Sequence, residues 1–290
     1  MAPRSSLLPV GALLLSATLW GVFWYPLRLL EQQGLAGLWS SLVIYGAALV
    51  VGMPALWRSR HALHQPRLLA LLALASGWTN IAFILAVLEG NVVRAMLLFF
   101  LSPLWTVLLG RFILGERLNT AARLTLLLAV SGSMIMLWDP ALGAPWPRQA
   151  ADWLAISAGF AFALSNVLVR RMQQVPVRLK AVAAWWGVVG LALIMIVAGA
   201  QPVPTVALPV WAAAALIGAL GIVLMTVAVV YGVTHMPAHR SAVILLFELV
   251  AGAVSSQLLT QEVVQPNEWL GGLLILTAGW FAARASLGER

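Results

Sequence analysis

Ten apolar runs account for most of this 290-residue chain. A bilayer-spanning helix needs roughly 20 consecutive apolar residues, and each run is long enough for one. The runs lack the alternating pattern of strands in a membrane barrel. We therefore predict an all-α polytopic membrane protein with ten transmembrane helices. The runs cover residues 7–30, 35–57, 68–88, 91–113, 120–138, 151–172, 178–198, 209–232, 238–260 and 267–286.

Composition supports a membrane protein over a soluble one. Hydrophobic residues make up 62% of the chain and charged residues only 9%, whereas ordinary soluble domains carry about 25% charged residues. The first run is too long for the apolar core of a signal peptide, and we expect it to be an uncleaved first helix. The chain has no cysteine, which excludes disulfides, thiol catalysis and cysteine-based metal sites.

The basic residues give an orientation. With ten spans and the N-terminus inside, all but three of the 17 Lys and Arg residues fall on the inner side, the exceptions being Arg28, Arg94 and Arg148. This distribution satisfies the positive-inside rule, so we expect a multi-pass protein of the cell inner membrane with both termini in the cytoplasm. The net charge of +8 follows from this topology, and we expect no nucleic-acid partner.

The chain repeats itself at an offset of 146 residues. Arg94 and Glu116 bracket one apolar segment, and Arg240 and Glu262 bracket its counterpart. Five spans per half would make the second copy enter the membrane from the opposite side. Inverted repeats of this kind are typical of carriers that work by alternating access. We predict a first repeat at 1–138 with the first five helices, a linker at 139–150 rich in Pro and Gly, and a second repeat at 151–290 with the other five.

Two segments resemble a known family. LSPLWTVLLGRFILGERLNTAARLTLLLAVSGSMIML is similar to the end of an EamA domain, and LLFELVAGAVSSQLLTQEVVQPNEWLGGLLILTAGW is similar to the second copy. The resemblance implies the drug/metabolite transporter superfamily, with ten helices in two EamA repeats. The aromatic content resembles the YddG-type exporters of aromatic amino acids. Where the family often has Glu-Pro, this chain has Glu248 and Leu249, so the kink that the resemblance implies lacks its proline here.

Glu248 is the sharpest candidate for contact with a substrate. It lies in the middle of the ninth run, and a carboxylate at that depth is costly unless it is paired, neutralised or in a wet cavity. Ser241 and Ser255 lie seven residues before and after it, on one face of a continuous helix. One interpretation is a cavity carboxylate that meets an ammonium group or exchanges a proton. The alternative is a protonated Glu that is bonded between helices.

Other candidates are aromatic or polar residues near the middle of their runs. Deep tryptophans favour a polar cavity, because the indole N–H needs a partner, whereas the tryptophans near run ends fit interfacial anchors. Amides at membrane depth face other helices or water, and proline frees a backbone carbonyl. The alternative for each is ordinary helix packing. The predicted substrate-binding residues, besides Glu248, are Trp20, Trp78, Thr79, Asn80, Phe99, Phe100, Ser102, Pro103, Ser165 and Asn166.

These features favour an exporter of small amphipathic metabolites, aromatic amino acids first, that uses a central cavity between the repeats. The alternatives are other substrates of the superfamily (drugs or cations, other amino acids, nucleotide sugars) or a channel-like facilitator. We find no metal or nucleophile motif and expect no enzyme activity, no cofactor and no metal. The expected partners are the lipid bilayer and the small-molecule substrate, and the oligomeric state stays open. Glu116 is expected to cap a turn or to pair with Arg117 or Arg123.

Overall fold

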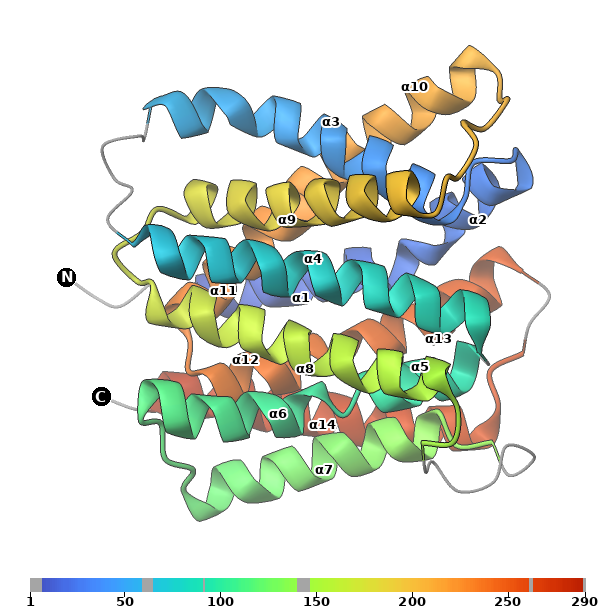
Figure 1. Ribbon diagram of the computed structural model, residues 1–290. Coiled ribbons are helices and arrows are strands. Elements are labelled where there is room, and N and C mark those ends of the chain that lie inside the picture. The colour runs from blue at the N-terminus through green and yellow to red at the C-terminus, as the bar shows by residue number, and fades with distance from the viewer. Residues whose placement is uncertain (1–6, 59–64, 91, 140–146, 261–262, 289–290) are drawn as a thin grey trace.

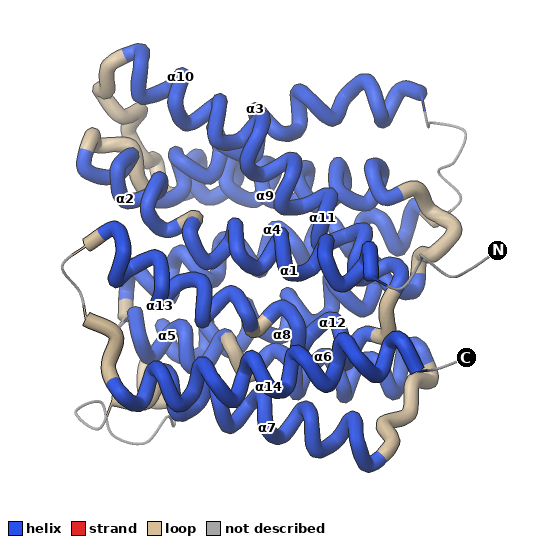
Figure 2. Tube along the Cα trace, turned by 180° about the vertical axis from the view of Figure 1, so that it is seen from behind, coloured by secondary structure: helices blue, strands red, loops and turns tan. Residues whose placement is uncertain are grey.

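The computed structural model describes residues 7–58, 65–90, 92–139, 147–260 and 263–288, and this part of the chain consists of helices joined by short loops, with no strand (Figures 1 and 2). Glu262 of the repeated block, and the terminal or loop arginines Arg4, Arg60 and Arg290, lie outside the described residues.

The helices follow the apolar runs of the sequence. The first half contains α1 (Leu7–Val22), α2 (Trp24–Gln32), α3 (Gly37–Arg58), α4 (Pro66–Glu89), α5 (Val92–Phe99), α6 (Ser102–Leu109), the π-helix η2 (Gly110–Leu114) and α7 (Thr120–Met136). The second half contains α8 (Ala150–Arg171), α9 (Val177–Ala198), α10 (Leu208–Leu216), the π-helix η4 (Ile217–Ile222), α11 (Val223–His235), α12 (Ala238–Leu245), α13 (Phe247–Leu259) and α14 (Pro266–Gly288).

Eight helical segments of the described chain are long and apolar enough to cross a membrane, when helices interrupted by a short break are taken as one segment. The helix α7, at 17 residues, is a shorter apolar helix, and α14, at 23 residues, packs along it. The chain is thus a multi-pass membrane protein. The exact number of ten spans stays a prediction.

The two halves cross the bundle in opposite directions. The first helix, α1, begins at the face where α14 ends, whereas α8 begins at the other face (Figure 1). We call the face where α1 begins and α14 ends the N/C face, and the other the opposite face. Loops at the N/C face connect α8 to α9 and α11 to α12 (Figure 1).

Helix packing is reciprocal between the halves. In the repeat, α1 corresponds to α8, α3 to α9, and α4 to the segment α10–η4–α11. The contact of α4 with α8 therefore has its counterpart in the contact of α11 with α1, and that of α4 with α9 in the contact of α3 with α10 and η4. The contact of α5 and α6 with α8 becomes that of α12 and α13 with α1, while α3–α9 and α7–α14 map onto themselves. The sequence repeat is therefore also a repeat in how the helices pack.

Both copies of the repeated block contain a broken helix at the same position. The first breaks at Phe100 and Leu101, between α5 and α6, and the second breaks at Leu246, which is 146 residues after Phe100. Pro103 explains the first break, since proline lacks the N–H of a regular helix. The second break has no proline: the Leu249 N–H instead bonds to the Leu246 carbonyl three residues back.

A glycine from the other repeat meets each broken helix. Gly21 of α1 lies so close to α13 that an added Cβ would come within 2.5 Å of the Glu248 carbonyl oxygen. Gly159 of α8 makes the equivalent approach to α5, where an added Cβ would lie 2.6 Å from the Phe99 carbonyl oxygen. Only a residue without a side chain allows backbones to approach this closely. The breaks are therefore packed against the first helix of the opposite repeat.

The tightest crossing gives a test of this packing. A Cβ at Gly187 of α9 would overlap the carbonyl oxygen of Ala73 on α4, so we expect Gly187→Ala to destabilise the protein by about 1–3 kcal/mol. The measurement is the thermal midpoint of purified protein in detergent. The control is Gly190→Ala in the same helix, where an added Cβ meets no atom within 4 Å. Equal midpoints for the two variants would contradict the close crossing.

Candidate functional site

The break between α5 and α6 gathers aromatic rings from three helices. The Phe99 ring lies 4.9 Å from that of Phe83 on α4, 5.3 Å from Phe100 and 5.5 Å from Phe162 on α8, measured between centroids. Phe100 is buried and Phe99 is half-buried. These two predicted residues therefore form part of an aromatic cluster in the middle of the bundle.

The polar candidates near this break are buried. Ser102 and Pro103 open α6 and are both buried. On α8, the Ser165 hydroxyl donates to the Phe162 carbonyl of its own helix at 2.8 Å. Asn166 is buried on the same helix. The break of the first repeat and the middle of α8 thus bring the predicted Phe, Ser, Pro and Asn side chains of these helices into one region.

The polar cluster predicted on α4 divides between two neighbours. The Trp78 indole N–H donates to the Ser157 hydroxyl of α8 at 3.1 Å, and Trp78 keeps 41% of its surface exposed. Asn80 donates to the Tyr45 hydroxyl of α3 at 3.4 Å, while its buried carbonyl oxygen has no partner in the described structure. The Thr79 hydroxyl bonds to the Ala75 carbonyl of its own helix. Trp78 and Asn80 therefore face different helices.

Glu248 and Trp20 lie on the other pair of packed helices, α13 and α1. Glu248 is half-buried in the first turn of α13, directly after the break. Trp20 is half-buried next to Gly21 and packs edge to face against Phe23 at 5.4 Å. The indole of Trp24, in the adjoining α2, donates to the Ser255 hydroxyl of α13 at 2.9 Å. Carboxylate and indole groups thus come from helices that meet at the second break.

The predicted face of Ser241, Glu248 and Ser255 assumed one continuous helix. The break at Leu246 separates Ser241 from the other two. Ser241 is buried in α12 and bonds to the carbonyls of Pro237 and Ala238. The shared face therefore extends only from Glu248 to Ser255, because a seven-residue spacing keeps its meaning only along an unbroken helix.

The two broken helices converge at the N/C face. There α6 packs against α12. Toward the opposite face, α5 packs against α4 and α8, while α13 packs against α1 and α14. The breaks thus lie where the segments α5–α6 and α12–α13 stop contacting each other and turn to different helices.

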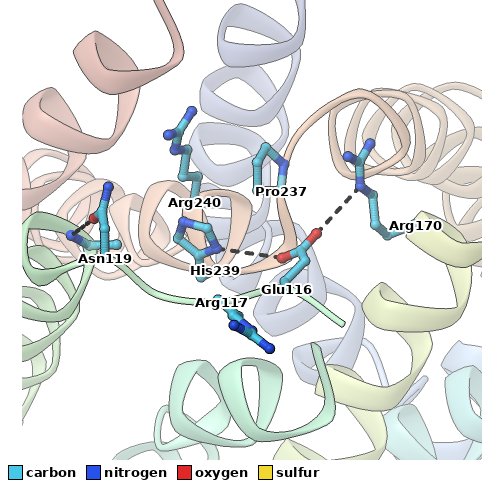
Figure 3. A pocket seen from close by; sticks show the side chains of 8 residues that line it. Glu116, Arg117, Asn119, Arg170, Pro237, His239 and Arg240 are labelled. Atoms are coloured by element: carbon cyan, nitrogen blue, oxygen red, sulfur yellow. Dashed lines mark hydrogen bonds and ion pairs between the residues drawn. The ribbon is translucent and has the colours of Figure 1, made fainter. Parts of the chain in front are cut away.

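At the N/C face the carboxylate of Glu116 joins the two repeats. Its Oε2 accepts a hydrogen bond of 2.9 Å from the backbone N–H of Ala238, which opens α12. The same carboxylate lies 3.5 Å from Nδ1 of His239 and 3.6 Å from Nε of Arg170. Figure 3 shows Glu116 between these two side chains. They line a pocket of about 260 Å³ together with Arg117, Asn119, Ala122, Pro237 and Arg240.

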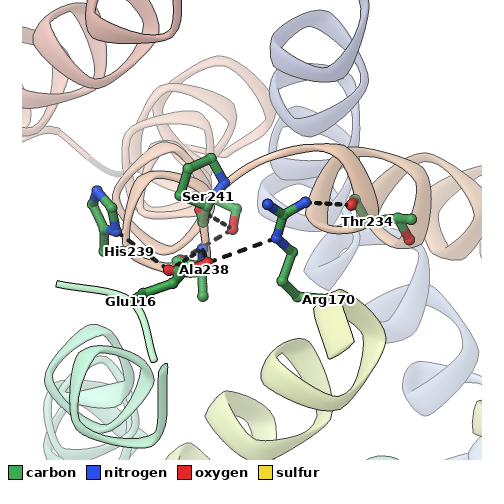
Figure 4. Close-up of polar contacts among 7 residues, drawn as sticks. Glu116, Arg170, Thr234, Ala238, His239 and Ser241 are labelled. Atoms are coloured by element: carbon green, nitrogen blue, oxygen red, sulfur yellow. Dashed lines mark hydrogen bonds and ion pairs between the residues drawn. The ribbon is translucent and has the colours of Figure 1, made fainter. Parts of the chain in front are cut away.

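Arg170 extends the contact to α11, because its guanidinium donates to the Thr234 carbonyl at 2.7 Å (Figure 4). The expected cap is present, since Glu116 accepts the first free N–H of α12. The ion-pair partners are Arg170 and His239 and not the predicted Arg117 or Arg123. Helix packing brings η2 against α8, and Glu116, just beyond η2, reaches the start of α12.

Burial alone would raise the pKa of the Glu116 carboxyl, but contacts with His239, the Ala238 N–H and the charge of Arg170 outweigh burial and hold the pKa below its ordinary value of 4.5. The carboxylate is therefore ionised at neutral pH. Its stabilising contribution is fully present above pH 4.5 and is lost as the pH falls through the lowered pKa.

The opposite face carries a second ion pair between the repeats. Nε of Arg94, in α5, lies 2.9 Å from Oδ1 of Asp152, in the first turn of α8. The other oxygen of Asp152 accepts hydrogen bonds from the backbone N–H groups of Arg148 and Gln149. Asp152 is buried, with 4% of its surface exposed. This pair fixes the start of α8 beside the start of α5.

Several residues of these sites were missed from the sequence. Tyr45 is a polar residue in the middle of an apolar run, so its position could have pointed to it. Arg170 and His239 lie in basic segments at helix ends, where positive charge is explained by topology. Their pairing with Glu116 depends on tertiary packing and has no local signal. The described residues contain no group of three or more His, Asp or Glu side chains that could hold a metal ion.

Comparison with known proteins gives a family match over most of the chain. The model of the EamA-like transporter family matches residues 7–138 and 149–283. A crystal structure with a TM-score of 0.75 covers 97% of this chain and 98% of its own. At 17% identity, that likeness shows the fold alone.

Named relatives are of modest similarity. Protein RarD of Streptomyces exfoliatus is 28% identical over 298 residues, covering 94% of this chain and 88% of the relative. Protein RarD of Salmonella typhi is 37% identical over 86 residues, so the match spans only 29% of that relative and 28% of this chain. An uncharacterized transporter of Pseudomonas aeruginosa, PA0485, is 30% identical over 190 residues, 61% of this chain and 58% of the relative.

Proposed function

Because the chain belongs to the EamA-like transporter family of the drug/metabolite transporter superfamily, we propose that it exports small amphipathic metabolites, aromatic amino acids first, by alternating access. In this proposal ten helices in two inverted repeats, 1–138 and 151–290 with a linker at 139–150, span the cell inner membrane. The N/C face is cytoplasmic, since the basic residues gather there, and substrate binds between the two repeats.

Glu248 carries the proposal. It lies near the middle of the segment Ala238–Leu259, directly after the break, and its carboxylate has no hydrogen-bond or ion-pair partner in the part of the chain that the structure describes. A carboxylate at membrane depth costs several kcal/mol unless it has a partner or water. The ammonium group of an amino acid supplies such a partner. Broken helices near the midplane are the usual place for a transporter's substrate.

The aromatic groups suit the other end of such a substrate. The Phe99 cluster provides ring faces and edges, and aromatic pairs gain about 0.5–1.5 kcal/mol beyond the burial of their area. Trp20, Trp78 and Asn80 add indole and amide groups at comparable positions along their helices, with Thr79, Phe100, Ser102, Pro103, Ser165 and Asn166 as further proposed contacts. Neither Lys nor Arg is among the proposed residues, which disfavours strongly anionic substrates such as nucleotide sugars.

Counterflow in proteoliposomes tests the proposal. Vesicles are loaded with unlabelled tryptophan and diluted into a trace of radiolabelled tryptophan, and we expect transient accumulation of the label. Parallel vesicles carry arginine, a lipophilic drug cation or a nucleotide sugar. Accumulation only with a drug cation or with another amino acid would contradict the proposal that aromatic amino acids are the substrate. Uptake that internal substrate does not accelerate would contradict a carrier mechanism and indicate a channel.

A further inference from the structure

At the N/C face, polar contacts that converge on Glu116 join two sets of helix ends (Figure 4). One side of this junction consists of the end of η2 and the end of α8, which are bonded to each other through the Arg171 guanidinium and the Ile113 carbonyl. The other side is the end of α11 with Thr234, the turn that follows, and the start of α12 at Ala238. The two sides also pack against each other directly, since α8 contacts both α11 and α12.

Three contacts of this junction cross from one side to the other: Glu116 with Ala238, Glu116 with His239, and Arg170 with Thr234. Glu116 accepts from the Ala238 N–H and lies within ion-pair distance of His239. Arg170 donates to the Thr234 carbonyl and lies 3.6 Å from the Glu116 carboxylate. Glu116 and Arg170 also form an ion pair with each other, so each side chain fixes the position of the other.

Lys180 also connects the two sides, because it bonds to the end of α8 and to Thr234. Its side chain is fully buried, and its ammonium group donates to the Thr234 hydroxyl and to the carbonyls of Val169 and Met172 at the end of α8. A cation at the C-terminal end of a helix is favoured by the free carbonyls there. Thr234 is therefore fixed by two cations, one on its carbonyl and one on its hydroxyl.

The residue one turn deeper than Arg170 on α8 is Asn166, which is buried and is also a predicted substrate contact. Residues four apart lie on the same face of a helix. A path from the substrate site to the N/C face along this side of α8 must therefore pass the Glu116–Arg170 contact.

We infer that Glu116 and Arg170 form a latch that closes the N/C end of the transport path. Opening this end requires the α11–α12 turn to leave both residues and Thr234 to leave Lys180. The latch is a positioning device: it selects which face of the protein is open and does not bind the substrate. The inference rests on the proposed transport function. It deepens that function by assigning the closing contact to named residues.

Accessibility of a single cysteine tests the latch without any substrate. The chain has no cysteine, so Asn166→Cys creates a unique thiol beneath the latch. Vesicles with the N/C face outward are treated with a membrane-impermeant maleimide, and the initial rate of labelling is measured. In the Glu116→Ala background we expect this rate to rise about tenfold, because the α12 cap and the ion pairs are both lost.

Matched variants give the reference rates. Arg117→Ala removes a side chain that lines the same pocket and is exposed, and labelling should stay unchanged there. Ala121→Cys, an exposed position at the start of α7, reports access of the reagent to this face and should react equally in all backgrounds. Glu116→Gln keeps an acceptor for the Ala238 N–H but loses the charge, and serves where the alanine variant folds poorly. We expect an intermediate rate for it.

Unchanged labelling of Asn166→Cys in both Glu116 variants would overturn the latch, as would an equal rise in Arg117→Ala. The measurement needs no transported substrate, so it separates the latch from the proposed function. Faster labelling in the Glu116 variants, in a protein that shows no counterflow with any of the substrates tested, would support the latch. The same result would contradict the proposed substrate class.

Discussion

Removing the carboxylate of Asp152 is expected to destabilise the protein by about 3–5 kcal/mol, because Asp152→Ala breaks a largely buried ion pair with Arg94. The side chains of Arg94 and Asp152 are only 12% and 5% exposed, so water cannot replace the lost contact fully. The variant also loses the acceptor of the N–H groups of Arg148 and Gln149. The measurement is the unfolding midpoint of purified protein in detergent, compared with the unchanged chain.

Glu268→Ala is the matched control. Glu268 occupies the first turn of α14, as Asp152 does in α8, and accepts a hydrogen bond from the Gln265 backbone N–H at 2.6 Å. It has no ion-pair partner among the described residues, so its loss should cost only the value of a helix cap, about 1 kcal/mol. The double variant Arg94→Ala/Asp152→Ala should be more stable than the sum of the two single losses predicts. Equal effects of Asp152→Ala and Glu268→Ala would show that the ion pair contributes nothing.

The helices and their repeat could be predicted from the sequence, because a long apolar run has one stable form in a bilayer. The break of the first repeat was also foreseeable, since Pro103 cannot complete a helix. The break at Leu246 was not. The i to i−3 bonding of Leu249 has no local signal, and Gly21, the residue of α1 that packs against this point, lies more than 200 residues earlier in the chain.

The candidate site divides in the same way. Polarity at membrane depth is costly, and this cost alone singles out Glu248, Asn80 and Asn166. What each residue contacts depends on helix packing: Asn80 turns to Tyr45, whereas Trp78, two residues earlier, turns to Ser157. For Glu116, neighbours in sequence were the wrong guide, because loop residues at a membrane face pair with whichever helix end lies beside them.

Replacing the carboxylate of Glu248 is expected to give the largest loss of transport. In Glu248→Gln the side chain keeps its size but cannot form a charge-assisted hydrogen bond with an ammonium group, a contact that contributes about 1.5–3 kcal/mol. We therefore expect counterflow of tryptophan to need roughly 10–100-fold more substrate for half-maximal rate. Glu89→Gln, an exposed acid at the end of α4, is the control and should leave transport unchanged.

A substrate series separates a binding carboxylate from a structural one. Indole-3-propionate keeps the ring and the carboxylate of tryptophan but lacks the ammonium group, so the unchanged protein should transport it poorly and Glu248→Gln should lose nothing further with it. If Glu248 is instead a protonated group bonded between helices, glutamine would replace it with little effect, because an amide donates and accepts the same bonds. Full tryptophan transport by Glu248→Gln, with a folded protein, would therefore reject Glu248 as the ammonium site and assign its charge no part in selecting the substrate.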